Sequence, residues 1–358
     1  MKPIIPFALL GALFAVGTAS AATTTPVGYI TVNIPANADS TISAPLAQAP
    51  LLSTASTGIA GNVISFTSSG VAADAFVNVG SPHFKTYVLI KSGPLSGKHF
   101  PVTANTTGTV TVDTGAGTLQ AQGFVTGNTF EVVPFWTLAT LFPGGAGVGG
   151  SNDIFDPTSF LLVSDQASTG PNRGAGAVYF YGNGADSTTP AWRNANDPEG
   201  PLANNVTIDP SIMYTIRTGP TPQTVTVTGE VPKVALATTL LTATQPNDED
   251  LAVRYPVDTT LAESGLQSAL VAASDPFDPT EFVFVYDDAA AGFNKGASAT
   301  YFYYDGTSGG TAGWKDNNAP DGPNVTAPVL KAGRAIVVRK APGAAATTTW
   351  TSPLPYTP

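Results

Sequence analysis

The chain has 358 residues, a formal net charge of −10, only 11% charged residues and no cysteine. The lack of cysteine excludes disulfides and thiolate metal sites. The acidic, charge-poor composition argues against nucleic acid and anionic lipid as partners. With 37 glycines and 31 prolines, it favours short strands joined by many turns.

The N-terminus has the three parts of an export signal in order. Lys2 supplies a positive charge, residues 4–16 are mostly apolar, and Ala19-Ser20-Ala21 matches the small-x-small cleavage pattern. We therefore predict a signal peptide over residues 1–21. The apolar run is shorter than the ~20 residues of a spanning helix, and later apolar runs have strand length. We expect no integral membrane segment, and a final location that is extracellular, at the cell surface or periplasmic.

Residues 59–130 alternate between apolar and polar positions and are punctuated by Gly and Asn, which is typical of short strands. The strand-like segments are NVISFTS, AFVNV, KTYVLIKSG, GKHFPVTA, GTVTVDT and NTFEVVP. We interpret them as a small β-barrel or sheet module inserted into a larger unit.

The rest of the mature chain contains a tandem duplication. DIFDPTSFLLVSDQASTGPNRGAGAVYFYGNG from Asp153 aligns without a gap with DPFDPTEFVFVYDDAAAGFNKGASATYFYYDG from Asp275. About half of the aligned positions are identical, and each pair is 122 residues apart. We predict a first unit over 22–219, a second unit over 220–342 and a C-terminal tail over 343–358.

These patterns predict an all-β fold of two tandem, related, sandwich-like domains, the first interrupted by the inserted module. Residues 160–164 and 177–181 are expected to form a hairpin. Asp165 with Arg173, and Asp287 with Lys295, bracket the loops of the two equivalent hairpins, which suggests cross-strand ion pairs. Short helical turns are expected near 137–141 and 261–271.

Several segments resemble one family of secreted proteins, found as paralogues in Verrucomicrobia-like environmental bacteria and without an assigned activity. The resemblance covers nearly the whole mature chain. It implies export and a β-rich fold, and it implies no substrate, cofactor or catalytic residue. The segments that carry it are PVGYITVNIPANADSTISAPL, PFWTLATLFP, GEVP and FDPTEFVFVYDDAAAGFNKGASATYFYYDG.

The duplicated aromatic clusters are the candidate ligand-binding residues, because sugar rings stack on exposed aromatic faces. The adjacent cations are suited to hydrogen-bonding hydroxyls or carboxylates. Cross-strand core packing explains the same pattern, and we favour it, because one face of each strand must be buried. The candidates are Tyr179, Tyr181, Trp192 and Arg193 in the first unit, and Tyr301, Tyr303, Trp314 and Lys315 in the second.

Metal and catalytic signatures are weak throughout the sequence. The acidic run 247–250 lacks the spacing of a calcium loop and is better read as a turn. His83 and His99 show no metal-ligand spacing, and no nucleophile elbow accompanies them. We assign no catalytic residue, metal or cofactor.

Three functions remain open at this point. The first is a non-catalytic structural or interaction protein that associates with itself or with an envelope or matrix polymer. The second is a carbohydrate-binding module that holds polysaccharide through the aromatic clusters. The third, an enzyme acting on extracellular polymer, has no positive support in the sequence.

Overall fold

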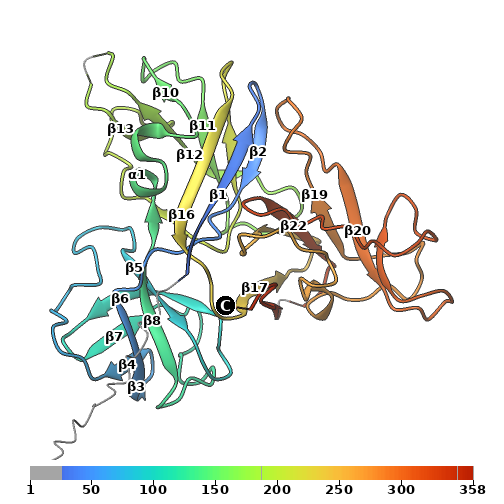
Figure 1. Ribbon diagram of the computed structural model, residues 1–358, viewed down its shortest axis with the longest axis horizontal. Helices are drawn as coiled ribbons and strands as arrows, with labels where there is room; N and C mark the ends of the chain where they lie inside the picture. The colour runs from blue at the N-terminus through green and yellow to red at the C-terminus, as the bar shows by residue number, and fades with distance from the viewer. Residues whose placement is uncertain (1–25, 187, 345, 358) are drawn as a thin grey trace, which may run out of the picture.

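The computed structural model of the protein describes residues 26–186, 188–344 and 346–357. Strands make up 40% of the chain and helices 3%, which confirms the all-β prediction. Within the described ranges, no helix has the length and apolar character needed to cross a membrane. The predicted signal peptide lies outside the described residues. Figure 1 shows a barrel at the lower left and two sheet-based units above it and to its right.

The inserted module is a closed six-stranded barrel with the strand order β3-β4-β7-β6-β5-β8. Alternate side chains point inward, as strand periodicity requires, and Ile64, Val88, Val110 and Phe130 are fully buried there. The strands are β3 (Leu52–Ala60), β4 (Val63–Phe66), β5 (Thr86–Ile90), β6 (His99–Asn105), β7 (Thr109–Val112) and β8 (Thr129–Pro134).

Two details of the barrel differ from the sequence prediction. The segment 75–79 is a turn and not a strand, because the Phe76 N–H is bonded to the Asn105 side chain (2.9 Å) instead of to a neighbouring strand. Strand β3 was missed, since its Ser, Thr and Gly residues give little apolar alternation. It supplies the sixth strand that closes the barrel.

The first unit is built on a six-stranded sheet with the path β10-β12-β11-β15-β2, to which β13 adds by pairing with β12. Its strands are β2 (Asp39–Ile42), β10 (Gly150–Ser151), β11 (Phe160–Ser164), β12 (Ala175–Gly182), β13 (Ala191–Asn194) and β15 (Tyr214–Arg217). A small pair and two short helices lie beside it: β9 (Trp136–Thr137), β14 (Thr207–Ile208), α1 (Leu138–Leu141) and η1 (Pro143–Gly145).

The second unit repeats this sheet with the order β18-β22-β19-β20-β21. The predicted hairpin is present in both copies, with Leu161 opposite Tyr179 and Val283 opposite Tyr301. The predicted helical turns are present as α1 and η2. The elements are β18 (Asn247–Ala252), η2 (Leu266–Ser268), β19 (Phe282–Val285), β20 (Ala299–Tyr304), β21 (Gly313–Asp316) and β22 (Ala335–Lys340).

A two-stranded ribbon covers each sheet and completes a sandwich-like core. Ribbon β1 (Val27–Ile34) with β16 (Gln223–Glu230) packs on the first sheet, and β17 (Leu236–Thr242) with β23 (Ala346–Ser352) packs on the second. Two predicted boundaries therefore shift. Strand β16 lies beyond residue 219 yet pairs within the first unit, and the predicted tail contains β23, which buries Trp350 in the second core.

Candidate functional site

Both duplicated tryptophans are core residues. Trp192 and Trp314 are 0% and 2% exposed, and each packs edge-to-face against a tyrosine of the neighbouring strand. Those tyrosines, Tyr181 and Tyr303, are half-buried. The indoles present no face to solvent, so the stacking platform proposed for them is wrong and the core-packing alternative accounts for them. Tyr179 is also half-buried, and Tyr301 is buried.

The cations beside the tryptophans also turn inward. Arg193 donates to the backbone carbonyls of Pro198 (2.8 Å) and Thr189 (3.0 Å), and Lys315 donates to that of Gly322 (2.7 Å). Arg193 thus holds the segments on both sides of its strand, and Lys315 holds the loop that follows its own strand. The prediction that they contact a ligand is therefore not supported by their geometry.

The structure brings together a set of residues that the sequence did not indicate. Arg217 forms a two-point ion pair with Asp39, with both N–O distances at 2.7 Å. Its equivalent in the second unit, Arg339, pairs with Asp248 in the same way, at 2.7 and 2.8 Å. Hydrogen bonding to these carboxylates raises the pKa of both guanidinium groups. Planar, bidentate pairs of this kind are among the strongest charged contacts in proteins.

Each ion pair is completed by the other unit. The backbone N–H of Asn294, in the second unit, donates to Asp39 (2.7 Å), and that of Asn172, in the first, donates to Asp248 (2.6 Å). Both asparagines have a positive φ, 50° and 54°, which this residue type tolerates better than most. We call this two-fold exchange of hairpin loops the reciprocal clasp. It comprises Asp39, Arg217 and Asn294 on one side and Asp248, Arg339 and Asn172 on the other.

Two predictions about charged residues are wrong: the cross-strand ion pairs of the hairpins and the turn at 247–250. Arg173 does not pair with Asp165 across its own hairpin and instead lies 3.7 Å from Glu249 and 3.8 Å from Asp250 in the second unit. Lys295 donates to backbone carbonyls of its own loop. The acidic run 247–250 is not a turn but part of buried strand β18, where burial raises the pKa of Glu249 and Asp250.

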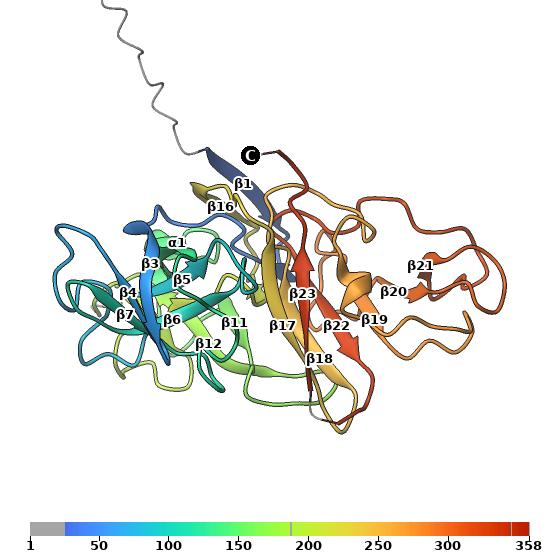
Figure 2. The same ribbon diagram turned by 90° about the horizontal axis from the view of Figure 1, so that it is seen from below.

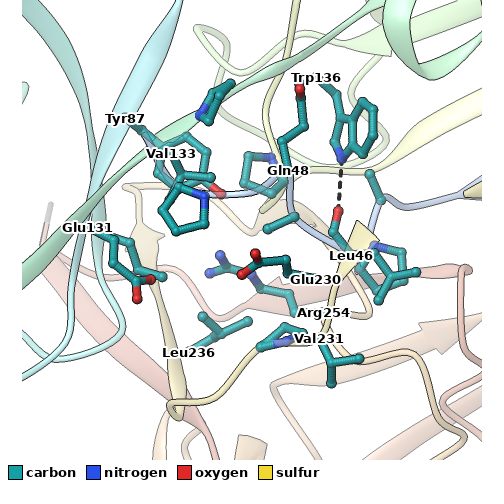
Figure 3. Close-up of a pocket in the computed structure, with 18 of the residues that line it drawn as sticks. Leu46, Gln48, Tyr87, Glu131, Val133, Trp136, Glu230, Val231, Leu236 and Arg254 are labelled. Atoms are coloured by element: carbon teal, nitrogen blue, oxygen red, sulfur yellow. Dashed lines mark hydrogen bonds between the residues drawn. The ribbon is translucent and has the colours of Figure 1, made fainter. Parts of the chain in front are cut away.

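A pocket opens where the barrel and the two units meet (Figure 3). Its volume of about 60 Å³ is enough for a few water molecules or a small polar group. In Figure 3 the Trp136 indole donates to the Leu46 carbonyl at one end (2.8 Å), and the Arg254 guanidinium points into the middle. The walls include Leu46, Trp136, Tyr87, Glu131, Leu236 and Arg254.

His99, Asp209 and Ser211 are the nearest approach to a catalytic constellation. The His99 ring nitrogen lies 3.3 Å from Asp209, and the Ser211 hydroxyl donates to the same carboxylate at 2.6 Å. Burial alone would raise the pKa of Asp209. The charge and the hydrogen bond of His99, together with two hydrogen bonds from Ser211, outweigh burial and lower this pKa. Because serine and histidine both bind the acid and not each other, the hydroxyl is not activated as a nucleophile.

Comparison with known proteins yields no match among family models, curated proteins or solved structures.

Proposed function

We propose that the protein is exported and serves as a non-catalytic interaction protein outside the cell or at its surface. The observation that carries the proposal is a pair of exposed phenylalanines, Phe155 and Phe277, which are 67% and 70% exposed. They occupy equivalent positions in the two units. Among the exposed large apolar side chains of the described residues, they form the only such equivalent pair.

Both phenylalanines are held by the same local structure. The Phe155 N–H donates to the Asp153 side chain (2.8 Å), and the Phe277 N–H donates to that of Asp275 (2.9 Å). Each loop reads D-x-F-D-P-T, so five of its six positions are identical in the two copies. A duplicated fold retains its core for packing reasons, but core packing does not explain an identical exposed phenylalanine. Binding of a common partner does explain it.

The position of the two loops favours a two-point attachment. Each loop precedes the first strand of its hairpin, β11 or β19, whereas the clasp loop follows that strand at its other end. The two phenylalanines therefore lie at the strand ends opposite to those that form the reciprocal clasp. A rigid body with two equal anchors gains avidity on a repetitive partner, such as an envelope or matrix polymer or an array of its own copies.

The experiment compares the wild-type protein with a Phe155→Ser/Phe277→Ser double variant in cell fractionation with protease shaving. We expect the wild type to pellet with envelope or matrix and the double variant to appear in the soluble fraction. The matched control is Tyr29→Ser/Val271→Ser, which removes two exposed apolar side chains, 75% and 61% exposed, that are not equivalent to each other. If the wild type is entirely soluble, or both variants fractionate alike, the proposal is wrong.

Polysaccharide binding is the second candidate, and a groove between the two units favours it. Two adjoining hollows of about 500 and 640 Å³ share Ala289, Lys331 and Arg334. Tyr286 lines the smaller hollow, and burial raises the pKa of its hydroxyl to about 12. An aromatic ring beside cations suits a saccharide chain. This function would be supported if Tyr286→Ala no longer retained polysaccharide while the control Tyr303→Ala still did. Equal retention of polysaccharide by both variants would contradict this function.

A further inference from the structure

Arg254 is buried without a carboxylate in direct contact, and the nearest negative charge that acts on it is that of Asp209. Only 5% of its surface is exposed, and its Nε has no hydrogen-bond partner in the part of the chain that the structure describes. Its Nη1 makes two long contacts, to the Ala237 carbonyl (3.3 Å) and the Thr238 hydroxyl (3.2 Å). No carboxylate of the described residues forms an ion pair with it. Since a guanidinium stays charged at physiological pH, this burial is costly unless an anion compensates it.

The surroundings of three other arginines differ from those of Arg254. Arg217 and Arg339 have two-point carboxylate partners. Arg193 is equally buried, and its Nε also has no partner among the described residues, but it donates to two carbonyls at 2.8 and 3.0 Å and faces none of the pockets described above. The guanidinium of Arg254 instead points into the pocket where the barrel and the two units meet, called here the junction pocket (Figure 3).

A second unused donor lines the same pocket. Tyr87, on barrel strand β5, is buried, yet its hydroxyl has no hydrogen-bond partner among the described residues. Burial raises the pKa of this hydroxyl, and the nearby charge of Arg254 partly opposes that effect. The barrel and the second unit thus each bring one free donor group to the pocket. Apolar side chains close the walls around them, among them Leu46, Val133 and Leu236.

The charged residues that line the pocket include one cation without an ion-pair partner at its centre, Arg254. Three cations line it, Arg254, Lys91 and Lys233, against two carboxylates, Glu131 and Glu230. Glu131 is already paired with Lys91 at 3.0 Å. Asp209, behind the lining, acts on Arg254 only at a distance, so a bound monoanion would be the direct contact partner that this guanidinium lacks.

We propose that the junction pocket is a binding site for a carboxylate group, held by the Arg254 guanidinium and the Tyr87 hydroxyl. The volume of about 60 Å³ admits a group of the size of acetate. The carboxylate belongs either to a free small acid or to the end of a larger ligand that reaches in through the opening. Because the donors come from different bodies, binding also holds the barrel against the second unit.

The first experiment titrates the full protein with sodium acetate at constant ionic strength, balanced by sodium chloride. Acetamide serves as the neutral probe of the same shape. We expect acetate to raise the melting temperature with a saturable binding curve, and acetamide to have no such effect. If acetate acts no better than chloride, or acetamide acts like acetate, the pocket is not a carboxylate site.

Three variants test whether Arg254 and Tyr87 are the residues that bind the acetate. Tyr87→Phe removes only a hydroxyl that has no protein partner, so it should fold normally and bind acetate about two- to tenfold more weakly. Arg254→Gln should abolish the acetate response. The control Arg193→Gln disturbs an equally buried arginine and should keep the response. Unchanged acetate affinity in Tyr87→Phe overturns the proposal even if Arg254→Gln fails to fold.

A third arm identifies the source of the carboxylate. N-acetyl-alanyl-alanine carries the same group at the end of a chain, and its C-terminal amide is the matched control. Tighter binding of the peptide acid than of acetate, with no binding of the amide, supports the site and assigns it to a larger ligand. Tighter binding of acetate supports it and assigns a free small acid. Equal binding of the peptide acid and its amide counts against the site.

Discussion

The backbone N–H of Asn294 donates a 2.7 Å hydrogen bond to Asp39, which lies 255 residues earlier in the chain. Asn172 makes the equivalent contact to Asp248 at 2.6 Å. Such reciprocity, in which each partner offers the other the same surface, is the pattern of an isologous interface in a two-fold dimer. Here one chain supplies both partners. The two units are consequently expected to unfold together and not one after the other.

Removing one acid of the clasp should be costly. In Asp248→Asn the bidentate partner of Arg339 is lost from a buried position, and we expect about 2–3 kcal/mol of destabilisation, since the arginine is itself partly exposed. Urea denaturation measures this cost. The control is Lys331→Met, which breaks an ion pair with Asp258 whose side chains are 53% and 46% exposed, and should cost under about 0.5 kcal/mol. Similar costs for both variants would mean that the clasp is no more than a surface pair.

The asparagines of the clasp act mainly through their backbone. Asn172→Ala puts at a positive φ a residue that tolerates this conformation less well than asparagine, and it removes an acceptor for Arg339, so a loss of about 2 kcal/mol is expected. Asn172→Gly keeps both the conformation and the N–H donor to Asp248, and should be about 1 kcal/mol more stable than the alanine variant. Equal stabilities in thermal denaturation would contradict this account.

The barrel docks on the second unit through a glycine with no spare space. A Cβ at Gly97 would lie 2.0 Å from the Ala235 carbonyl oxygen, and the Gly97 carbonyl accepts from the Ala237 N–H (3.0 Å). Gly97→Ala should therefore cost about 1–3 kcal/mol more than Gly115→Ala. Gly115 is the matched control because its φ is also positive, whereas nothing lies within 4 Å of its added Cβ. Differential scanning calorimetry of both variants tests the difference, which should be near zero if the barrel is only loosely attached.

The two buried tryptophans should affect stability and not binding. Trp192→Ala and Trp314→Ala are each expected to cost about 3–5 kcal/mol, because each leaves a large cavity in its core. The milder Trp192→Phe and Trp314→Phe variants should remain folded and retain any polysaccharide binding that the wild type shows. Affinity electrophoresis of the folded variants measures that retention. A loss of polysaccharide binding without a loss of stability would support the hypothesis that sugar rings stack on the tryptophans.

Buried Asp288 predicts a specific pH dependence. It accepts from Thr41 through both the backbone N–H (2.6 Å) and the hydroxyl (2.8 Å), but burial outweighs these bonds and the charge of Arg334, and raises its pKa above the ordinary 3.8. The folded state then binds a proton more readily than the unfolded state. Its contribution to stability increases as pH falls from 7 through the raised pKa, and levels off below about 3.8.

The measurement is the stability of the wild type minus that of Asp288→Asn, taken by urea denaturation from pH 7 to pH 4. Asparagine does not titrate, so the difference should shift in favour of the wild type as the solution becomes more acid. A difference that stays flat, or moves the other way, would show that the pKa of Asp288 is not raised.

Features that depend on near neighbours in the chain were predictable. The barrel strands, the Phe160–Ser164 hairpin and the constant step of 122 residues follow from alternation, turn residues and internal identity, which are local signals. The run at 247–250 misled the prediction for the same reason. Asparagine and acidic residues are usual in turns. A buried strand of them is possible here because Arg339 on β22 pairs with Asp248 and Arg173 lies beside Glu249 and Asp250.

Sequence alone determined the all-β class, the duplication and the inserted module, because strand period and repeat register are written in consecutive residues. Tertiary structure alone decided that Trp192 and Trp314 are buried, which acid each arginine meets, and that Arg254 and Tyr87 share a pocket. Those pairings join residues that are far apart in the chain, and their residue types are equally suited to a surface or a core. Packing of the three bodies selects among these environments, and it is this packing that creates the clasp and the junction pocket.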